Sequence, residues 1–175
     1  PIAACLAETL WPGPMTLILT RRPDCPIALQ TSAGLDKIAL RVPAHAEARA
    51  LLEAFGRPVA APSANPSGRI SPTRAEHVLA GLGGRIELVL DGGPCESGLE
   101  STVIDCTGDT ANILRPGGIT REAVAATLAA RGMTLATESP PTDEDAPASP
   151  GQLASHYAPS APVRLNVTAA EPGME

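Results

Sequence analysis

Aromatic residues are scarce in this chain: among its 175 residues the aromatic ones are Trp11, Phe55 and Tyr157. The core must therefore be built from aliphatic side chains, and a surface that stacks nucleic-acid bases on aromatic rings is disfavoured. There is no excess of basic residues either, because 13 Lys and Arg stand against 19 Asp and Glu and give a net charge of −6. Proteins held to nucleic acid by phosphate contacts usually carry the opposite sign. Tight nucleic-acid binding is therefore disfavoured, and any such binding is expected to be weak.

Several diagnostic patterns are also missing. No apolar run approaches the roughly 20 residues of a membrane-spanning helix, and the first residues lack the order of a signal peptide, so we expect a cytoplasmic protein without membrane contact. P-loop, Rossmann and H-E-x-x-H motifs are absent. The cysteines show no C-x-x-C spacing and no histidine at zinc-finger distance. We therefore expect free thiols and no protein-bound metal at Cys5, Cys25, Cys95 and Cys106.

Short aliphatic runs alternate with helical stretches, separated by loops rich in the chain's 16 glycines and 19 prolines. Hydrophobic residues make up 43% of the chain, which is enough to bury one main core. The alternation favours an α/β (α+β) layered fold. The sequence predicts helices over 2–10, 44–55, 71–82 and 121–130, and strands over 15–20, 37–42, 58–61, 86–90, 101–106 and 111–114.

Local signals predict where these elements begin and end. Ser71 followed by Pro72 is typical of a helix start, and Thr120 is expected to cap the last helix. Gly56 stands where a C-cap is expected.

The domain organisation is predicted from composition. Residues 139–150 hold four prolines and three acidic residues, the composition of a linker. We expect one main domain over 1–138, a linker over 139–160 and the start of a second domain over 161–175. Since the first helix has no N-cap residue before it, the chain is expected to start within a fold.

The loop from Ser63 to Ser71 combines hydroxyl groups with the amide of Asn65, between a run of small residues and a predicted helix start. Hydroxyl donors and the N–H groups at a helix N-terminus suit a phosphate. The alternative is that Ser63 and Asn65 form ordinary turns. Both interpretations remain open from the residues alone.

Two arginines occupy positions at or near strand ends. Arg41 lies within an apolar run, and Arg115 ends a strand where α/β sheets collect ligands. Their planar guanidinium groups suit phosphate or carboxylate, and a surface ion pair is the alternative for each. Ser101 and Thr102 follow a glycine-rich loop and are expected at the same face, unless they simply begin a strand.

Short motifs follow one another in a distinctive order along most of the chain. They are WPGPMT (11–16), LRVP (40–43), APSAN (61–65), SG (67–68), SPT (71–73), DGG (91–93), GLESTV (98–103), LRPG (114–117), SPG (149–151) and HYAP (156–159). In order and spacing they resemble the YrdC-like threonylcarbamoyl-AMP synthases of the longer, two-domain type. The resemblance implies a twisted, mixed open sheet flanked by helices.

The resemblance also implies an activity. Members of this family are nucleotidyltransferases that make threonylcarbamoyl-AMP from L-threonine, bicarbonate and ATP, with Mg²⁺ accompanying the ATP, and release pyrophosphate. Downstream proteins use the product to modify tRNA. Six positions are implied to contact ATP: Lys37, Ser63, Asn65, Ser71, Arg115 and, from the linker, Tyr157. Three are implied to contact L-threonine, with the guanidinium of Arg41 on its carboxylate: Arg41, Ala61 and Ser101.

The family's basic K-x-R-type motif, which lies upstream of the WPGP segment, has no counterpart in this sequence. We therefore expect the 175-residue chain to be inactive by itself. Two other functions are alternatives. A tRNA or double-stranded-RNA binding module is disfavoured by the net charge, and the carbamoyl-transfer domain of a hydrogenase maturation protein, which shares the fold, is disfavoured by the His-Tyr linker.

Overall fold

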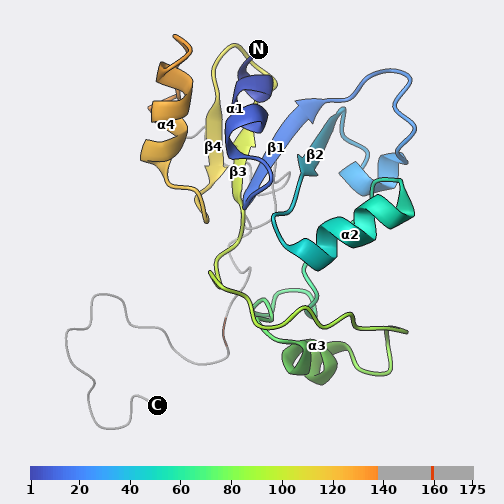
Figure 1. The fold of residues 1–175 in the computed structure, drawn as a ribbon. Coiled ribbons are helices and arrows are strands. Elements are labelled where there is room, and N and C mark those ends of the chain that lie inside the picture. The colour runs from blue at the N-terminus through green and yellow to red at the C-terminus, as the bar shows by residue number, and fades with distance from the viewer. Residues whose placement is uncertain (138–158, 160–175) are drawn as a thin grey trace, which may run out of the picture.

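The computed structural model describes residues 1–137 and 159. Its elements confirm the predicted mixed α/β fold (Figure 1). The helices are α1 (Ile2–Leu10), α2 (Ala46–Phe55), α3 (Ala75–Leu82) and α4 (Arg121–Ala129), with a short 3-10 helix η1 (Leu29–Ser32). The strands are β1 (Met15–Thr20), β2 (Lys37–Arg41), β3 (Thr102–Asp105) and β4 (Asn112–Arg115).

The four strands form one mixed sheet in the order β2-β1-β3-β4. Strand β1 runs parallel to β3 and antiparallel to β2, while β4 runs antiparallel to β3. Both central strands are short, aliphatic and buried, as expected for strands with a neighbour on each side. Chain segments that lie more than 80 residues apart are thereby joined, since Met15 pairs with Thr102.

Helices α1 and α4 pack against one another and cover one face of the sheet (Figure 1). The core between them is aliphatic, as the scarcity of aromatic residues requires. Its fully buried side chains include Leu6, Leu17, Ile104, Val124 and Leu128. Burying each such side chain stabilises the fold by roughly 1.5–3 kcal/mol.

Two predicted helix caps are confirmed. The Thr120 hydroxyl accepts a hydrogen bond from the Ala123 N–H at 3.2 Å, which satisfies a free donor at the start of α4. Gly56 ends α2 with a φ of 67°, a conformation that glycine adopts without steric cost.

The predicted strands at 58–61 and 86–90 are wrong. Within the described part of the chain neither segment pairs with another strand. Their apolar side chains are consequently left in solvent, with Val59 47%, Leu88 82% and Leu90 63% exposed. Aliphatic composition favours a strand, but a strand forms only where a neighbouring chain segment takes up its hydrogen bonds.

The predicted start of the third helix is also wrong. Helix α3 begins at Ala75 after Arg74, and no side chain caps it. The Ser71 hydroxyl, predicted to cap this helix, donates instead to the Glu100 carboxylate. The predicted linker and second domain lie outside the described residues apart from Pro159, so the domain boundaries remain predictions.

Candidate functional site

The 11–16 motif forms a tight turn that ties together the ends of three strands. Trp11 Nε1 donates to the carbonyl of Met15 at 2.8 Å and closes the turn. Gly13 N–H donates to the Val42 carbonyl at 2.9 Å, just beyond β2. The Pro14 carbonyl accepts from Thr102 N–H at 3.0 Å, at the start of β3. The turn therefore fixes β1, β2 and β3 relative to one another at one end of the sheet.

A row of four residues crosses the sheet at this end. Arg41 on β2 pairs with Thr16 on β1, Thr16 pairs with Val103 on β3, and Val103 pairs with Arg115 on β4. Residues directly opposite one another on adjacent strands project from the same face. Both predicted ligand-binding arginines therefore belong to one row, on which Thr16 and Val103 lie between them.

Ser101 is held beside this row. Its hydroxyl lies 2.8 Å from the Thr16 hydroxyl and accepts a hydrogen bond from Arg115 Nη2 at 3.2 Å. Its carbonyl accepts from Arg115 Nε at 3.2 Å and Nη2 at 2.9 Å. Ser101 is only 6% exposed. The Ser101 hydroxyl, predicted to bind threonine, and the Arg115 guanidinium, predicted to bind ATP, are therefore in direct contact.

Arg41 is oriented by the turn. Its Nε donates to the Gly13 carbonyl at 3.3 Å, while the residue as a whole is exposed to solvent. This contact holds the side chain at the edge of the row. An exposed guanidinium that is anchored at Nε suits capture of a small carboxylate from solution.

The 114–117 motif packs directly on the backbone of 100–102. Gly118 N–H donates to the Glu100 carbonyl at 2.9 Å. A Cβ atom on Gly117 would lie 2.4 Å from the Glu100 carbonyl oxygen and 2.5 Å from the Thr102 nitrogen. No side chain fits there, which explains why glycine follows Arg115-Pro116.

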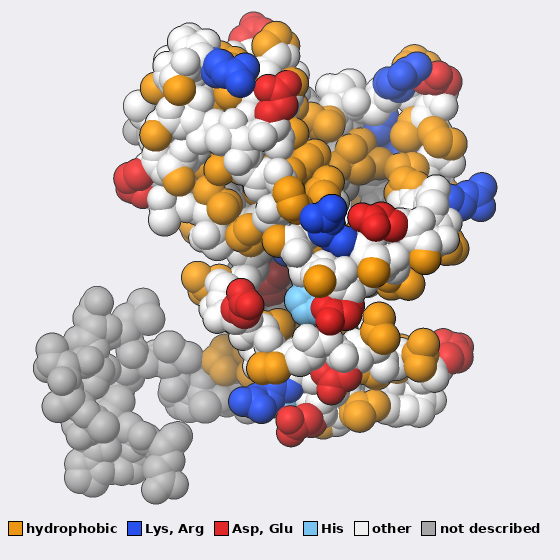
Figure 2. Space-filling model, viewed as in Figure 1, with side chains coloured by type: hydrophobic (Ala, Val, Ile, Leu, Met, Phe, Trp, Pro, Cys, Tyr) orange, Lys and Arg blue, Asp and Glu red, His pale blue; other side chains and the backbone are white. Residues whose placement is uncertain are grey.

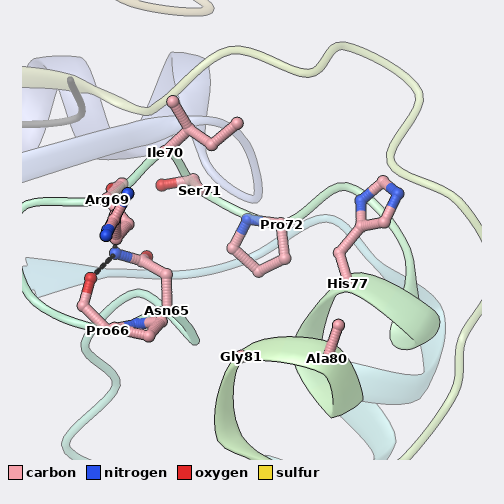
Figure 3. A pocket seen from close by; sticks show the side chains of 9 residues that line it. All are labelled: Asn65, Pro66, Arg69, Ile70, Ser71, Pro72, His77, Ala80 and Gly81. Carbon is pink, nitrogen blue, oxygen red and sulfur yellow. Dashed lines mark hydrogen bonds between the residues drawn. The ribbon is translucent and has the colours of Figure 1, made fainter. Parts of the chain in front are cut away.

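A second cluster begins at Ser71, whose hydroxyl donates to Glu100 Oε1 at 2.5 Å. Because Glu100 adjoins Ser101, this bond brings the loop of predicted ATP contacts close to the row on the sheet. Ser71 also lines a cavity of about 370 Å³ between this loop and α3, which is within the size range of small-molecule sites. Figure 3 shows Asn65, Ile70 and Pro72 from the loop and His77, Ala80 and Gly81 from α3 around it.

The rest of this loop makes local contacts. Asn65 Nδ2 donates to the carbonyls of Pro66 at 2.9 Å and Arg69 at 3.0 Å (Figure 3 draws the first). In the structure Asn65 therefore forms an ordinary local turn, the alternative that the sequence left open. Its Oδ1 is buried without a hydrogen-bond partner among the described residues. Ser63 and Ala61 are exposed on the same loop.

Lys37 is not brought into the site. It lies at the other end of β2, four residues or roughly 13 Å from Arg41 along an extended strand. Its Nζ forms an ion pair with Asp105 Oδ2 at 3.0 Å. Burial by itself would raise the pKa of Asp105, but hydrogen bonds from Thr107 and the Lys37 charge outweigh it and bring the pKa below its ordinary value of 3.8. Tyr157 lies outside the described residues.

The cysteines are free thiols, as predicted. Burial, with a smaller effect from the neighbouring Asp105 carboxylate, raises the pKa of Cys106 to about 12, so this thiol is a poor nucleophile.

Among the described residues no group of three or more His, Cys, Asp or Glu side chains is arranged to hold a metal ion. No described helix is long and apolar enough to cross a membrane.

Comparison with known proteins shows the family of the chain. Residues 2–117 match the Sua5/YciO/YrdC family, described as "Telomere recombination". The chain belongs to the Sua5/YciO/YrdC family. Residues 119–174 also match the family described as "Threonylcarbamoyl-AMP synthase, C-terminal domain".

Curated relatives of this Sua5/YciO/YrdC member carry the name threonylcarbamoyl-AMP synthase. The Bacillus subtilis protein is 45% identical over 163 residues, which cover 93% of this chain and 46% of the relative. The Pyrococcus abyssi protein is 43% identical over 161 residues, covering 92% of this chain and 46% of the relative. The chain therefore spans about half the length of these curated relatives.

Solved structures of Pyrococcus abyssi Sua5 are also similar to this chain. The crystal structure of P. abyssi Sua5 complexed with L-threonine matches with a TM-score of 0.78 and 42% identity, over 91% of this chain and 46% of that one. A variant of P. abyssi Sua5 with an adjacent histidine and tyrosine changed to alanine matches with a TM-score of 0.68 and 46% identity, over 71% of this chain and 36% of that one.

Sequence reasoning missed two side chains that hold this site together. Thr16 and Glu100 both stand inside recognised motifs, but no role was predicted for either. Their signal was indirect: a hydroxyl and a carboxylate sit in otherwise apolar or glycine-rich segments, where a polar group needs a partner. Neither partner is close in sequence, since Ser101 follows Thr16 by 85 residues and Glu100 follows Ser71 by 29.

Proposed function

We propose that this protein is an L-threonylcarbamoyladenylate synthase. It joins L-threonine, bicarbonate and ATP into threonylcarbamoyl-AMP and releases pyrophosphate and water. The product supplies a tRNA-modifying reaction, so the proposal includes downstream tRNA-modification proteins as partners and the cytoplasm as its setting. Its support is the family membership and the shared name of relatives that are 45% and 43% identical to this chain.

The observation that carries the proposal is the row at one end of the sheet. Arg41 and Arg115 lie on the outer strands, and the Thr16 and Ser101 hydroxyls lie together between them. This gives two cationic groups separated by two hydroxyls. The carboxylate of an amino acid and the phosphates of a nucleoside triphosphate are both anionic, so two separated cationic groups suit the two substrates bound side by side.

In this proposal these residues position the two substrates and stabilise the negative charge on the phosphate. The reaction makes an N–C bond between the threonine nitrogen and the bicarbonate carbon, which loses one oxygen as water, and an O–P bond between the resulting carbamate and the α-phosphate, from which pyrophosphate leaves. Arg41 would pair with the threonine carboxylate, and Ser101 would hydrogen-bond threonine next to it. Arg115 would stabilise negative charge on the phosphate. Mg²⁺ enters this proposal as part of the Mg–ATP substrate and adds charge neutralisation when bound.

The remaining predicted contacts have unequal support. Ser71 lines the cavity and is linked through Glu100 to the row, which supports a role in ATP binding. Asn65 lines the same cavity. Ser63, Ala61 and Tyr157 stay in the proposal on the resemblance alone, and Lys37 does so despite its distance from the row.

Figure 2 shows acidic and basic side chains interspersed over the visible face, which gives no support to an RNA-binding surface there.

The test is pyrophosphate release by the protein at its full natural length. We expect release that depends on ATP, L-threonine and bicarbonate together, and that falls to background when any one is omitted. L-serine and L-valine serve as matched controls for the threonine side chain. Release that is independent of the amino acid would contradict the proposal.

A further inference from the structure

The contact between Ser71 and Glu100 sets the direction of one hydroxyl in the candidate nucleotide site. Ser71 Oγ donates to Glu100 Oε1 at 2.5 Å, a length typical of an O–H bond to a carboxylate. Both side chains are partly buried. The bond links the loop at the cavity to the segment that begins β3, and it is the side-chain hydrogen bond that Ser71 makes among the described residues.

Glu100 is itself firmly placed. Its carbonyl accepts from Gly118 N–H at 2.9 Å, and Gly117 packs so closely on it that no Cβ would fit. The next residue, Ser101, is held by Thr16 and Arg115. The backbone from which the carboxylate reaches Ser71 is therefore fixed on both sides.

The polarity of the Ser71 hydroxyl follows from this contact. A carboxylate has acceptor oxygens and no proton to give, so the proton of the bond comes from Ser71. A hydroxyl has a single proton and two lone pairs. With its proton directed at Glu100, the Ser71 oxygen can only accept further hydrogen bonds.

A phosphate is a poor partner for such a pair. Phosphate oxygens are acceptors, so they would find no proton at Ser71, and the Glu100 carboxylate beside it would repel them. The cation suited to a phosphate is Arg115, which contacts Ser101 and not Ser71 in the hydrogen bonds of the described structure. The Ser71 oxygen suits instead a neutral hydrogen-bond donor, of which a nucleoside carries two kinds: ribose hydroxyls and the adenine amino group.

We propose that Glu100 is a positioning residue that directs the proton of Ser71 away from the ligand, so that Ser71 accepts a hydrogen bond from the nucleoside part of ATP and does not bind its phosphates. This inference rests on the proposed function, because it assumes that ATP occupies the cavity beside Ser71. It reverses the role that sequence reasoning gave to the hydroxyls of this loop, which was to donate to phosphate.

The experiment measures ATP and L-threonine affinity by calorimetry in four variants of the protein at its full natural length. Ser71→Ala removes the acceptor. Glu100→Met keeps the length of the side chain but removes the oxygens that hold the proton. Glu100→Gln keeps one acceptor oxygen, loses the charge and replaces the other oxygen by an amide NH2 donor. Glu96→Gln is the matched control, an exposed carboxylate four residues away in the same loop.

We expect Ser71→Ala and Glu100→Met to weaken ATP binding by a similar factor of about 3 to 10, the size of one neutral hydrogen bond. A fifth variant combines Ser71→Ala with Glu100→Met, and it should bind ATP no more weakly than either single variant, because both changes remove the same interaction with the ligand. Glu100→Gln should retain most of the affinity, and Glu96→Gln all of it. Threonine affinity should stay within twofold in all four variants.

Analogues then identify the donor. ATP is compared with three analogues. 2′-deoxyATP lacks the ribose 2′-hydroxyl, 3′-deoxyATP lacks the 3′-hydroxyl, and inosine triphosphate lacks the adenine amino group. One analogue should bind more weakly than ATP to the unmodified protein, and this difference should disappear in Ser71→Ala. Inorganic tripolyphosphate, which has no nucleoside, should bind equally to the unmodified protein and to Ser71→Ala.

Three results would overturn the inference: weaker tripolyphosphate binding in Ser71→Ala, additive losses in the double variant, or equal losses for ATP and threonine in Glu100→Met. Unchanged ATP affinity in Ser71→Ala and Glu100→Met, with normal binding by the unmodified protein, would defeat this inference and leave the proposed function standing. An unmodified protein that binds neither ATP nor threonine would defeat both.

Discussion

The Thr16 hydroxyl lies 2.8 Å from the Ser101 hydroxyl, which couples β1 to the segment that begins β3, in the same row as the two arginines. The two residues are 85 positions apart in the chain, and Ser101 is buried. Thr16 therefore holds in place the serine that is proposed to contact threonine.

Replacing Thr16 by valine tests this coupling. Thr16→Val keeps the shape of the side chain and removes the hydroxyl, so Ser101 loses a partner and the protein loses about 0.5–1.5 kcal/mol of stability. Ser101→Ala removes the same bond, and the two losses in the free energy of unfolding should not add. Urea unfolding of the single and double variants measures this. Thr9→Val, on α1 and away from the site, is the control that should add normally.

Arg41 is expected to recognise the threonine carboxylate. Arg41→Lys keeps the charge but loses the planar pair of donors, so threonine affinity should fall while ATP affinity stays within twofold. Calorimetric titration with each ligand separates the two. Arg49→Lys on the exposed surface of α2 provides the same chemical change outside the site. Equal loss of both ligands in Arg41→Lys would indicate damage to the fold.

Arg115 is expected to contribute a charge-assisted contact to ATP. Losing one such bond costs about 1.5–3 kcal/mol, so Arg115→Ala should weaken ATP binding by roughly 10- to 150-fold. Threonine binding should weaken by no more than a few-fold, because Ser101 keeps its contact with Thr16. Arg131→Ala, which removes an exposed ion pair with Glu8, is the matched control. Full nucleotide affinity in Arg115→Ala would remove this residue from the site.

The Lys37–Asp105 pair makes a prediction about acid stability. The pKa of Asp105 is lowered in the folded protein, so its ionised form stabilises the fold above the ordinary value of 3.8, and this contribution is lost as the pH falls through the lower folded value. Asp105→Asn should therefore cost about 1 kcal/mol near pH 7 and little in acid below the folded pKa. Urea unfolding across this pH range measures the difference, and Asp24→Asn, in a highly exposed pair with Arg22, is the matched control, expected to change stability near pH 7 by no more than about 0.5 kcal/mol.

The same pair decides the role of Lys37. If Lys37 acts only as the partner of Asp105, Lys37→Met should lower stability and leave ATP affinity unchanged. A tenfold loss of ATP affinity in Lys37→Met would instead support the contact implied by the family resemblance. The placement of Lys37 at the far end of β2 favours the first result.

Much of the fold could be predicted because its signals are local. Aliphatic runs marked β1 to β4, and Thr120 and Gly56 marked helix ends through their own backbone chemistry. The segment 86–90 shows where local signals fail. Its composition favours a strand as strongly as that of β1, yet a strand needs a partner, and pairing is decided by parts of the chain far away in sequence.

The site could be predicted in part for the same reason. Motif resemblance pointed to Arg41, Ser101 and Arg115, and the structure groups them, but it does not group Lys37 with them. The interactions that orient the site were not predictable from spacing. The bonds of Ser101 to Thr16 and of Ser71 to Glu100 depend on the sheet register and on the close packing at Gly117.

The most direct test of the proposed function follows the bicarbonate carbon. The protein at its full natural length is incubated with ATP, L-threonine and ¹³C-bicarbonate, and adenylates are analysed by mass spectrometry. We expect one adenylate that contains both threonine and the labelled carbon, formed only when all three substrates are present and strongly reduced in Arg41→Lys. An unlabelled threonyl-adenylate, or no threonine-containing adenylate at all, would contradict the account.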